Sequence, residues 1–299
     1  MPADLPGLAD AERRAMDVRI PTAGPAPVVA RDDPYSDRLR CDHPDARDGA
    51  ALGRALLEAA VGHGRRRVVV LARRGLAPGL QEAGYWLEGV IPGYYRGAED
   101  CCVLGGAPGG KPAPASPAME AEVDALAQRY PKWVSPPGVL TERARPRDAT
   151  AVAAMVAPRL RFYPTPIGNA AYLERRLATP APFRVVREEG AVAACAGADL
   201  DPAARAAELT DCFTAPSHRR RGLMRALLAD LMRDLAGQGY LTAFTLCRAT
   251  SPGINLAFKG LGFTFRGRMI RSCRIGEGIE DMNVWSRGIP GPTAPMAGA

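Results

Sequence analysis

The chain has 299 residues, of which 47% are hydrophobic, and a formal net charge of +7 at pH 7. This is enough apolar sequence for one large or two modest domains, and the lack of any run of 18 apolar residues predicts no membrane span. The start of the chain has no apolar segment typical of a signal peptide, and the seven cysteines include no CxxC pair. We therefore expect a cytoplasmic protein with buried, unpaired thiols and no metal site.

The basic charge comes almost entirely from arginine, because only three of the 39 basic residues are lysines. Alanine, glycine and proline are also abundant, which points to a bias of composition and not to a surface selected for polyanions. No nucleic-acid-binding motif is present, so we expect no specific nucleic-acid partner.

Proline- and alanine-rich composition predicts disordered tails at residues 1–27 and 290–299. Between the tails, a Gly/Pro/Ala-rich linker from Gly105 to Ala118 and a helix at Met119–Tyr130 separate two blocks. The expected domains are therefore a first block at 28–104, a linker and helix at 105–138, and a second block at 139–289.

The first block alternates helical and strand patterns, which predicts an α/β domain. Its expected elements are a helix at Gly49–Gly62, a strand at 65–74, a second helix, and strands within 84–97 and 98–105. It contains no glycine-rich phosphate loop.

The second block predicts a mixed sheet, because several neighbouring strands are joined by short turns. Its expected elements are a strand at Val139–Ala144, a helix capped by Asp148, a turn and helix at 162–177, strands at 182–189, 191–200 and 206–215, a helix, a strand at 241–248, another helix, and strands at 263–272 and 282–287.

The most informative segment runs from Ala206 to Tyr240, where an expected strand leads through a basic loop into an amphipathic helix. Apolar side chains recur at helical spacing and glycines end the pattern: Leu223, Leu227, Leu228, Leu231, Met232, Leu235, Gly237 and Gly239. The loop consists of Arg219, Arg220, Arg221 and Gly222. Backbone N–H groups at a helix start attract anions, arginines add charge-assisted hydrogen bonds, and a glycine lets the backbone approach a phosphate. The segment therefore predicts a phosphate-binding site.

This loop resembles motif A of the GNAT acetyltransferases, R/Q-x-x-G-x-G/A, which cradles the pyrophosphate of CoA. Here it reads Arg219-x-x-Gly222-x-Met224, with Met224 in place of the usual small residue. Residues 251–263 (SPGINLAFKGLGF) resemble motif B, which implies that Asn255 binds the pantetheine arm. The tyrosine that is a frequent general acid of the superfamily would fall at Phe258, so no general acid is assigned. The implied acetyl-CoA-binding residues are Phe213, Thr214, Arg219, Arg220, Arg221, Gly222, Leu223, Met224, Asn255 and Phe258.

Several segments are similar to the β-lysine N6-acetyltransferase family. They are EGVIPGYYRG (88–97), YPTPIGNAAYL (163–173), ELTDCFTAPSHRRRGLMRALL (208–228), FTLCRATSPGINLAFKGLGF (244–263) and IGEGIEDMNVWSR (275–287). The resemblance covers most of residues 30–288. It implies an α/β GNAT acyl-CoA N-acyltransferase fold with a mixed α+β sheet, preceded by a smaller GNAT-like α/β domain without a cofactor loop.

The same resemblance implies a reaction. Acetyl-CoA would be the cosubstrate, and acetyl would pass to the terminal amine of β-lysine (3,6-diaminohexanoate), giving N6-acetyl-β-lysine, a compatible solute of osmoadaptation.

The acceptor amine has an ordinary pKa of about 10.4 and must lose a proton before it attacks. Glu208 and Asp211 lie on the expected strand before the loop, and either is a candidate base. Strand alternation places them on opposite faces, so we expect one to face the site, with Asp211 preferred because it is nearer the loop. The backbone N–H near Phe213 is expected to polarise the thioester carbonyl. For either carboxylate, a structural or surface role is the alternative.

Further residues are assigned to the acceptor. Arg248, at the end of an expected strand, would bind the carboxylate of β-lysine, and Glu280 or Asp281 the second ammonium. Tyr163 and Trp285 would wall the pocket. The alternatives are a structural ion pair for Arg248 and core packing for the two aromatic residues.

Other functions remain open at this point. The same fold could acetylate a polyamine, another amino acid or a protein, or it could be a non-catalytic acetyl-CoA-binding module. The expected partner is a small-molecule amine, and a homodimer is left open.

Overall fold

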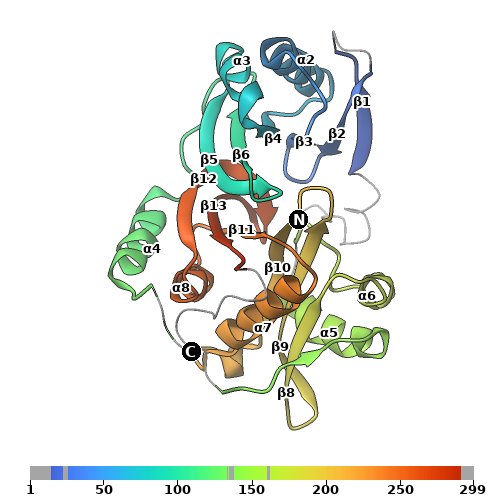
Figure 1. Ribbon diagram of the computed structural model, residues 1–299, viewed down its shortest axis with the longest axis vertical. Coiled ribbons are helices and arrows are strands. Elements are labelled where there is room, and N and C mark those ends of the chain that lie inside the picture. Colours follow the sequence, from blue (N-terminus) through green and yellow to red (C-terminus); the bar gives the residue numbers. More distant parts are fainter. Residues whose placement is uncertain (1–14, 23–25, 133, 135–137, 160–161, 291–299) are drawn as a thin grey trace, which may run out of the picture.

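A computed structural model describes residues 15–22, 26–132, 134, 138–159 and 162–290. The described strands form one 13-stranded sheet in the order β1-β2-β3-β4-β6-β5-β12-β13-β11-β10-β9-β8-β7 (Figure 1). The helices are α2 (Gly49–Gly62), α3 (Ala77–Glu82), α4 (Pro117–Arg129), α5 (Ala149–Val156), α6 (Ala170–Leu177), α7 (Leu223–Gly237) and α8 (Pro252–Gly260). The strands are β1 (Met16–Ile20), β2 (Val28–Asp33), β3 (Arg38–Asp42), β4 (Arg67–Arg73), β5 (Trp86–Tyr95), β6 (Glu99–Gly106), β7 (Glu142–Arg143), β8 (Phe183–Glu188), β9 (Ala191–Asp201), β10 (Ala206–Thr214), β11 (Thr242–Arg248), β12 (Thr264–Ile275) and β13 (Gly278–Gly288).

The two halves of the sheet repeat one topology. In the N-terminal half, β2 and β3 are antiparallel, β3 and β4 are parallel with α2 between them, and β4, β6 and β5 follow as antiparallel neighbours. In the C-terminal half, β9, β10, α7, β11, β13 and β12 repeat this order and these directions. The sheet is therefore mixed, as the short turns predict, and each half contains one parallel pair joined through a helix.

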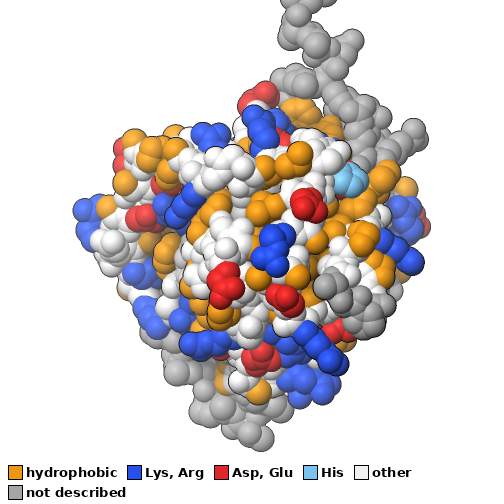
Figure 2. Space-filling model, turned by 90° about the horizontal axis from the view of Figure 1, so that it is seen from above, with side chains coloured by type: hydrophobic (Ala, Val, Ile, Leu, Met, Phe, Trp, Pro, Cys, Tyr) orange, Lys and Arg blue, Asp and Glu red, His pale blue; other side chains and the backbone are white. Residues whose placement is uncertain are grey.

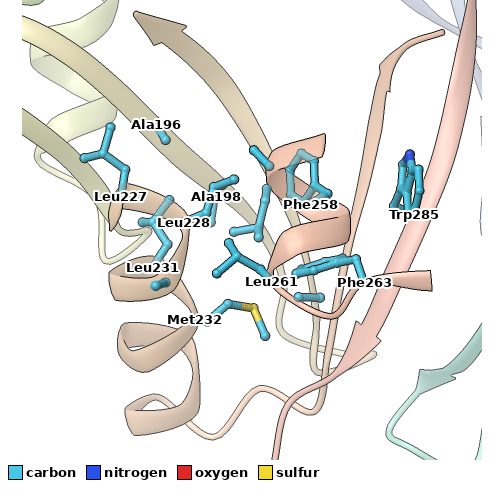
Figure 3. Packing of buried hydrophobic residues seen from close by; sticks show 14 of the residues in the cluster. Ala196, Ala198, Leu227, Leu228, Leu231, Met232, Phe258, Leu261, Phe263 and Trp285 are labelled. Atoms are coloured by element: carbon cyan, nitrogen blue, oxygen red, sulfur yellow. The ribbon is translucent and has the colours of Figure 1, made fainter. Parts of the chain in front are cut away.

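The helix α7 packs on one face of the C-terminal sheet, where β9 presents mostly small side chains. Figure 3 shows the apolar face of the helix lying against alanines of β9; the labelled residues are Leu227, Leu228, Leu231, Met232, Ala196 and Ala198. The alanines let the helix lie close to the sheet, and all six predicted apolar stripe residues of α7 are buried. The opposite face of β8 and β9 is covered by α5 and α6, whose buried residues form a separate cluster with those strands.

The halves meet where β5 and β12 pair at Gly89 and Gly267. Gly267 has φ +145°, and a Cβ there would lie 1.9 Å from the carbonyl oxygen of Glu88, so only glycine fits. A buried ion pair reinforces this seam: Arg67 bonds Glu88 at 2.5 Å, and both side chains also bond the backbone of Ile270 on β12 at 2.9 Å. Strands of both halves thus lie in fixed register.

Most expected elements are found, with differences at the edges. Helix α2 has the predicted bounds, and the helix after the linker runs over Pro117–Arg129. Residues 16–20 form β1 and pair with β2, so the expectation of a disordered tail up to residue 27 is wrong there. The strand expected at 139–144 is reduced to two residues. Within the described residues, no helix is long and apolar enough to cross a membrane.

Candidate active site

A cavity of about 1070 Å³ lies where β10 and β11 separate. These parallel strands pair only from Ala206 to Glu208, against Thr242 to Phe244, although β10 continues to Thr214 and β11 to Arg248. Past the last pair, β10 stays bonded to β9 and β11 to β13, so a gap opens between them. Backbone groups that line this gap have no strand partner within it, which suits an extended ligand with amide groups.

The phosphate-binding loop predicted from the sequence borders this cavity. Gly222 precedes α7 in the left-handed conformation, at φ +76°, and no side chain in the described part of the protein caps the helix N-terminus. Arg219 and Arg220 line the cavity together with Gly222. Arg221 does not line it, because its guanidinium pairs with Glu188 at 2.7 Å. Free N–H groups at a helix start, flanked by two guanidinium groups, fit a pyrophosphate.

The equivalent positions of the N-terminal half are closed. The carboxylate of Asp48 accepts hydrogen bonds from Ala50 and Ala51 at 2.9 and 3.0 Å, so the N-terminus of α2 is already occupied by an anion. The strands β3 and β4 pair over five residues without separating. Neither a phosphate nor an extended ligand therefore has a place there, which explains physically why this half contains no cofactor loop.

Both candidate bases line the cavity, and the expectation that alternation separates them is wrong. A β-bulge between Thr210 and Phe213 interrupts the pairing of β10 with β9, and Asp211 has φ +52°. The bulge rotates Asp211 away from regular alternation, so that it faces the same cavity as Glu208.

Asp211 is 1% exposed, and only one of its carboxylate oxygens has a partner among the residues that the structure describes. Oδ1 accepts a hydrogen bond from Thr165 at 3.2 Å, whereas Oδ2 is buried without a partner. Burial raises the pKa of Asp211 to about 7, with a further contribution from Asp199, while Arg176 and the hydrogen bond from Thr165 lower it. A carboxyl with a pKa near neutrality and an unpaired oxygen is suited to accept a proton.

Glu208 has a similar pKa of about 7, raised by burial and by nearby carboxylates and lowered by Arg40 of β3. Arg40 lies in the N-terminal half, yet it lines the same cavity together with Arg38. Sequence reasoning missed both arginines. The signal was present as alternation along β3, where Arg38, Arg40 and Asp42 share one face and Leu39 and Cys41 the other.

Asn255 does not line the cavity, and its amide is fully used inside the protein. It is 0% exposed; its nitrogen donates to the carbonyls of Arg248 and Ser251 at 2.9 and 2.7 Å. Its oxygen accepts from Asn283 and Trp285, each at 2.9 Å. The expectation that Asn255 binds pantetheine is therefore replaced by a structural role, in which it joins the start of α8 to β11 and β13.

Two predicted aromatic residues belong to the core. Phe258 is 0% exposed and packs edge-on against Phe263 (Figure 3), and Trp285 packs edge-on against Phe265. Neither lines the cavity. Phe258, the position at which the superfamily often has a general-acid tyrosine, thus lies inside the apolar core.

The predicted acceptor residues divide between the cavity and its surroundings. Tyr163 and Arg248 line the cavity, but Glu280 and Asp281 do not. Arg248 bonds Glu280 at 2.6 Å, which is the structural ion pair weighed as its alternative. Asp281 is 0% exposed and accepts hydrogen bonds from the backbone of Ala115 and Arg271.

Near the loop, Phe213, Thr214, Leu223 and Met224 line the cavity as expected. Phe213 pairs with Cys195 on β9, and its backbone N–H lowers the pKa of the Cys195 thiol, which partly offsets the rise due to burial. That N–H therefore points toward β9, which does not support its expected role of polarising the thioester.

Sequence comparisons agree with this geometry. Residues 153–263 match the model of the acetyltransferase (GNAT) family. The chain is 39% identical over 160 residues to a β-lysine N6-acetyltransferase of Methanosarcina mazei, an alignment that covers 54% of this chain and 59% of that relative. It is 27% identical over 263 residues to the N-acetyltransferase YodP of Bacillus subtilis, covering 87% of this chain and 95% of YodP.

Among solved structures, an acetyltransferase of Salmonella typhimurium with its cofactor acetyl-CoA is 20% identical, with a TM-score of 0.44, and covers 54% of this chain and 99% of that one. The matched family segment contains the separating strands, the uncapped helix and both raised-pKa carboxyls. The chain therefore carries, at residues 153–263, a domain of the GNAT acetyltransferase family.

Proposed function

We propose that the protein is an acetyl-CoA-dependent N-acetyltransferase that acts on the terminal amine of a small diamino acid, with β-lysine as the preferred acceptor. The observation that supports it best is the cavity between β10 and β11, which has an uncapped helix N-terminus at one end and Asp211 and Glu208 along its wall. The helix N-terminus fits the phosphates of CoA, and the two carboxylates fit the ammonium group of an acceptor. The names of the relatives support β-lysine as the acceptor.

In this proposal, Arg219, Arg220 and Gly222 hold the pyrophosphate, and the gap beside β10 takes the extended pantetheine arm. Bound acetyl-CoA supplies a thioester, whose C–S bond breaks as the acceptor nitrogen forms the new C–N bond. Asp211 accepts the proton that the ammonium loses, through its unpartnered Oδ2. The nitrogen loses a second proton as the amide forms, and the departing thiolate can take it up because the ordinary pKa of such a thiol is about 8.5. The reaction therefore needs no separate acid at the position of Phe258.

A diamine without a carboxylate is the second candidate, because Asp199, Glu208 and Asp211 all line the cavity. Three carboxyl groups would suit a dication. A diamino acid and a diamine differ in the carboxylate, so only the diamino acid would offer a partner to a cationic group of the site.

The test is a panel of amines incubated with purified protein and acetyl-CoA, with CoA release and product mass measured. We expect β-lysine to give a monoacetylated product at its terminal amine, with α-lysine and the diamines slower. A protein that binds acetyl-CoA but acetylates none of these amines would refute the proposal. Preference for a diamine would retain the enzyme class and change the acceptor.

A further inference from the structure

Two arginines of the N-terminal half reach the cavity of the C-terminal half. Arg38 and Arg40 alternate on β3 and both line the cavity. Arg38 is 6% exposed and already engaged: it bonds Asp33 at 3.1 Å and the carbonyl oxygen of Ser272. Arg38 therefore fastens β3 to β12, and its Nε and one Nη group are used inside the protein.

Arg40 is held differently. Its Nε lies 2.9 and 2.8 Å from the two carboxylate oxygens of Asp42, which fixes the direction of the guanidinium. Neither of its Nη groups has a hydrogen-bond partner among the described residues. The side chain is 22% exposed, and although burial acts to lower it, the attraction of Asp42 and Glu208 raises the pKa of Arg40 above its ordinary value, so the group is always charged.

Each of the other arginines of the cavity wall has a protein partner for one Nη group or a proposed role, although the Nε atoms of Arg225 and Arg248 are buried without a partner among the described residues. Arg248 pairs with Glu280, and Arg225 donates to the hydroxyl of Tyr130 at 2.7 Å. Arg219 and Arg220 lie at the start of α7, where the phosphate site is proposed. Of the guanidinium groups that line the cavity away from that loop, Arg40 is the one whose two Nη groups are free of protein partners in the described part of the chain.

Arg40 and Glu208 interact electrostatically, but no hydrogen bond joins them. Opposite charges that face one cavity without touching leave space for a zwitterion, whose ammonium would meet the carboxylate and whose carboxylate would meet the guanidinium. Asp211 lies three residues further along β10, a distance of at most about 10 Å along a strand. Arg40 acts on the pKa of Glu208 and is not among the main groups that shift the pKa of Asp211, which agrees with the order cation, carboxylate and candidate base along the wall.

We propose that the Nη groups of Arg40 bind the carboxylate of the amino-acid acceptor, with Glu208 binding the adjacent 3-ammonium group and Asp211 the terminal amine. This rests on the proposed N-acetyltransferase function and names the residue that selects an amino acid over a diamine. In β-lysine, three methylene groups separate the carbon that bears the 3-ammonium from the terminal nitrogen, so the two ends can lie at Glu208 and at Asp211.

The assignment also gives the N-terminal half a function. That half has no cofactor site of its own, yet the sheet seam at Gly89 and Gly267 and the contact of Arg38 with Ser272 hold β3 against the catalytic half. Its contribution to the reaction is one arginine in a fixed position. Arg248, the residue expected from the sequence to bind the carboxylate, would instead hold Glu280.

The experiment compares β-lysine with pentane-1,4-diamine, which is β-lysine without its carboxylate. For the parent we expect a higher kcat/KM with β-lysine. Arg40→Gln should lower kcat/KM for β-lysine at least tenfold, mainly through KM, and change that for the diamine less than threefold. Arg40→Lys should fall between, because lysine keeps the charge but loses the two-pronged geometry.

Two controls separate substrate recognition from folding. Arg54 on α2 is exposed and forms no hydrogen bond or ion pair with the described residues, so Arg54→Gln should match the parent with both amines. The calorimetric Kd for acetyl-CoA should be unchanged in every variant. Should Arg40→Gln fail to fold, Arg40→Lys carries the test, with an expected loss of at least threefold for β-lysine alone.

The outcomes are distinct. If Arg40→Gln keeps the parent's preference for β-lysine, or loses both substrates equally, the assignment of Arg40 is wrong while the acetyltransferase stands. A parent that prefers the diamine overturns the carboxylate contact in the same way. A parent that binds acetyl-CoA and acetylates neither amine overturns the proposed function and this inference together.

Discussion

At the scale of single residues, the acid–base properties of β10 depend on burial. Asp211 and Glu208 each have a pKa of about 7, raised mainly because the surrounding protein disfavours their charged forms. A base must be unprotonated to accept a proton. The rate should therefore fall as the pH drops below about 7, when the carboxylate becomes protonated, and should be constant just above it.

The pH profile distinguishes the two carboxyls. We expect Asp211→Asn to lower kcat by roughly 10² or more at pH 8 and to remove the acid limb of the profile. Glu208→Gln should raise KM for β-lysine more than it lowers kcat. Stopped-assay profiles of both variants from pH 5.5 to 9 measure this. The reverse pattern would make Glu208 the base, and full kcat in both variants would exclude both.

Asp211 also affects stability, with a defined sign. Its folded pKa lies above its unfolded value of 3.8, so the folded state binds the proton more tightly, and stability falls as the pH rises from about 4 to about 7. Asp211→Asn should therefore increase the free energy of unfolding at pH 8, by on the order of 2–4 kcal/mol, and change it little at pH 4. Urea denaturation at both values checks this; equal effects at the two pH values would contradict the assigned cause.

At the scale of elements, the start of α7 depends on Gly222. Its φ of +76° is strained for a branched side chain, and a Cβ there would stand beside the proposed phosphate. Gly222→Val should raise the Kd for acetyl-CoA at least tenfold, which corresponds to about 1.4 kcal/mol. Calorimetry of the folded variant measures it.

The matched control for Gly222→Val is Gly190→Val. Gly190 has a similar φ of +80°, lies in the turn between β8 and β9, and has open space around its Cβ position. The Gly190→Val variant should lose about as much stability as Gly222→Val, without any change in its affinity for acetyl-CoA. If both variants bind acetyl-CoA like the parent, the loop before α7 is not the phosphate site.

At the scale of the whole molecule, two units of one topology meet at the seam of β5 and β12, which fixes the geometry of the proposed acceptor site. Figure 2 views the end of the molecule formed by the N-terminal half and shows acidic and basic side chains interspersed around that face. The charge to which we assign a function in this half is that of Arg40 on β3, which lines the cavity. A displacement of the two halves at the seam should therefore weaken binding of the acceptor more than binding of acetyl-CoA.

Gly267→Ala tests the seam, because its Cβ would overlap the carbonyl oxygen of Glu88. We expect it to destabilise the protein by more than about 2 kcal/mol and to raise KM for β-lysine, with acetyl-CoA affinity retained in the folded fraction. The control is Gly278→Ala on the hairpin that joins β12 and β13, where nothing lies near the added Cβ. If Gly267→Ala changed neither the stability nor the KM for β-lysine, the seam would not set the geometry of the proposed acceptor site.

Local patterns determined much of this protein. Leucine spacing located α7, because helical periodicity acts over a few neighbouring residues. The loop that predicts an anion site, Arg219–Gly222, lies at the cavity and at the start of that helix. The order of strands and helices likewise follows from short-range patterning, including the mixed sheet.

What the sequence could not decide depends on contacts between distant residues. The bulge that rotates Asp211 breaks the period-two alternation, and no local signal reports it. Asn255 lies where the motif resemblance puts it, but its partners on β13 are 28 and 30 residues away and consume its amide. Arg40 enters a cavity built by another half of the chain. Periodicity identifies which face of a strand is polar, but only the packing of β3 against β12 determines what that face meets, because the seam is made by strands far apart in the sequence.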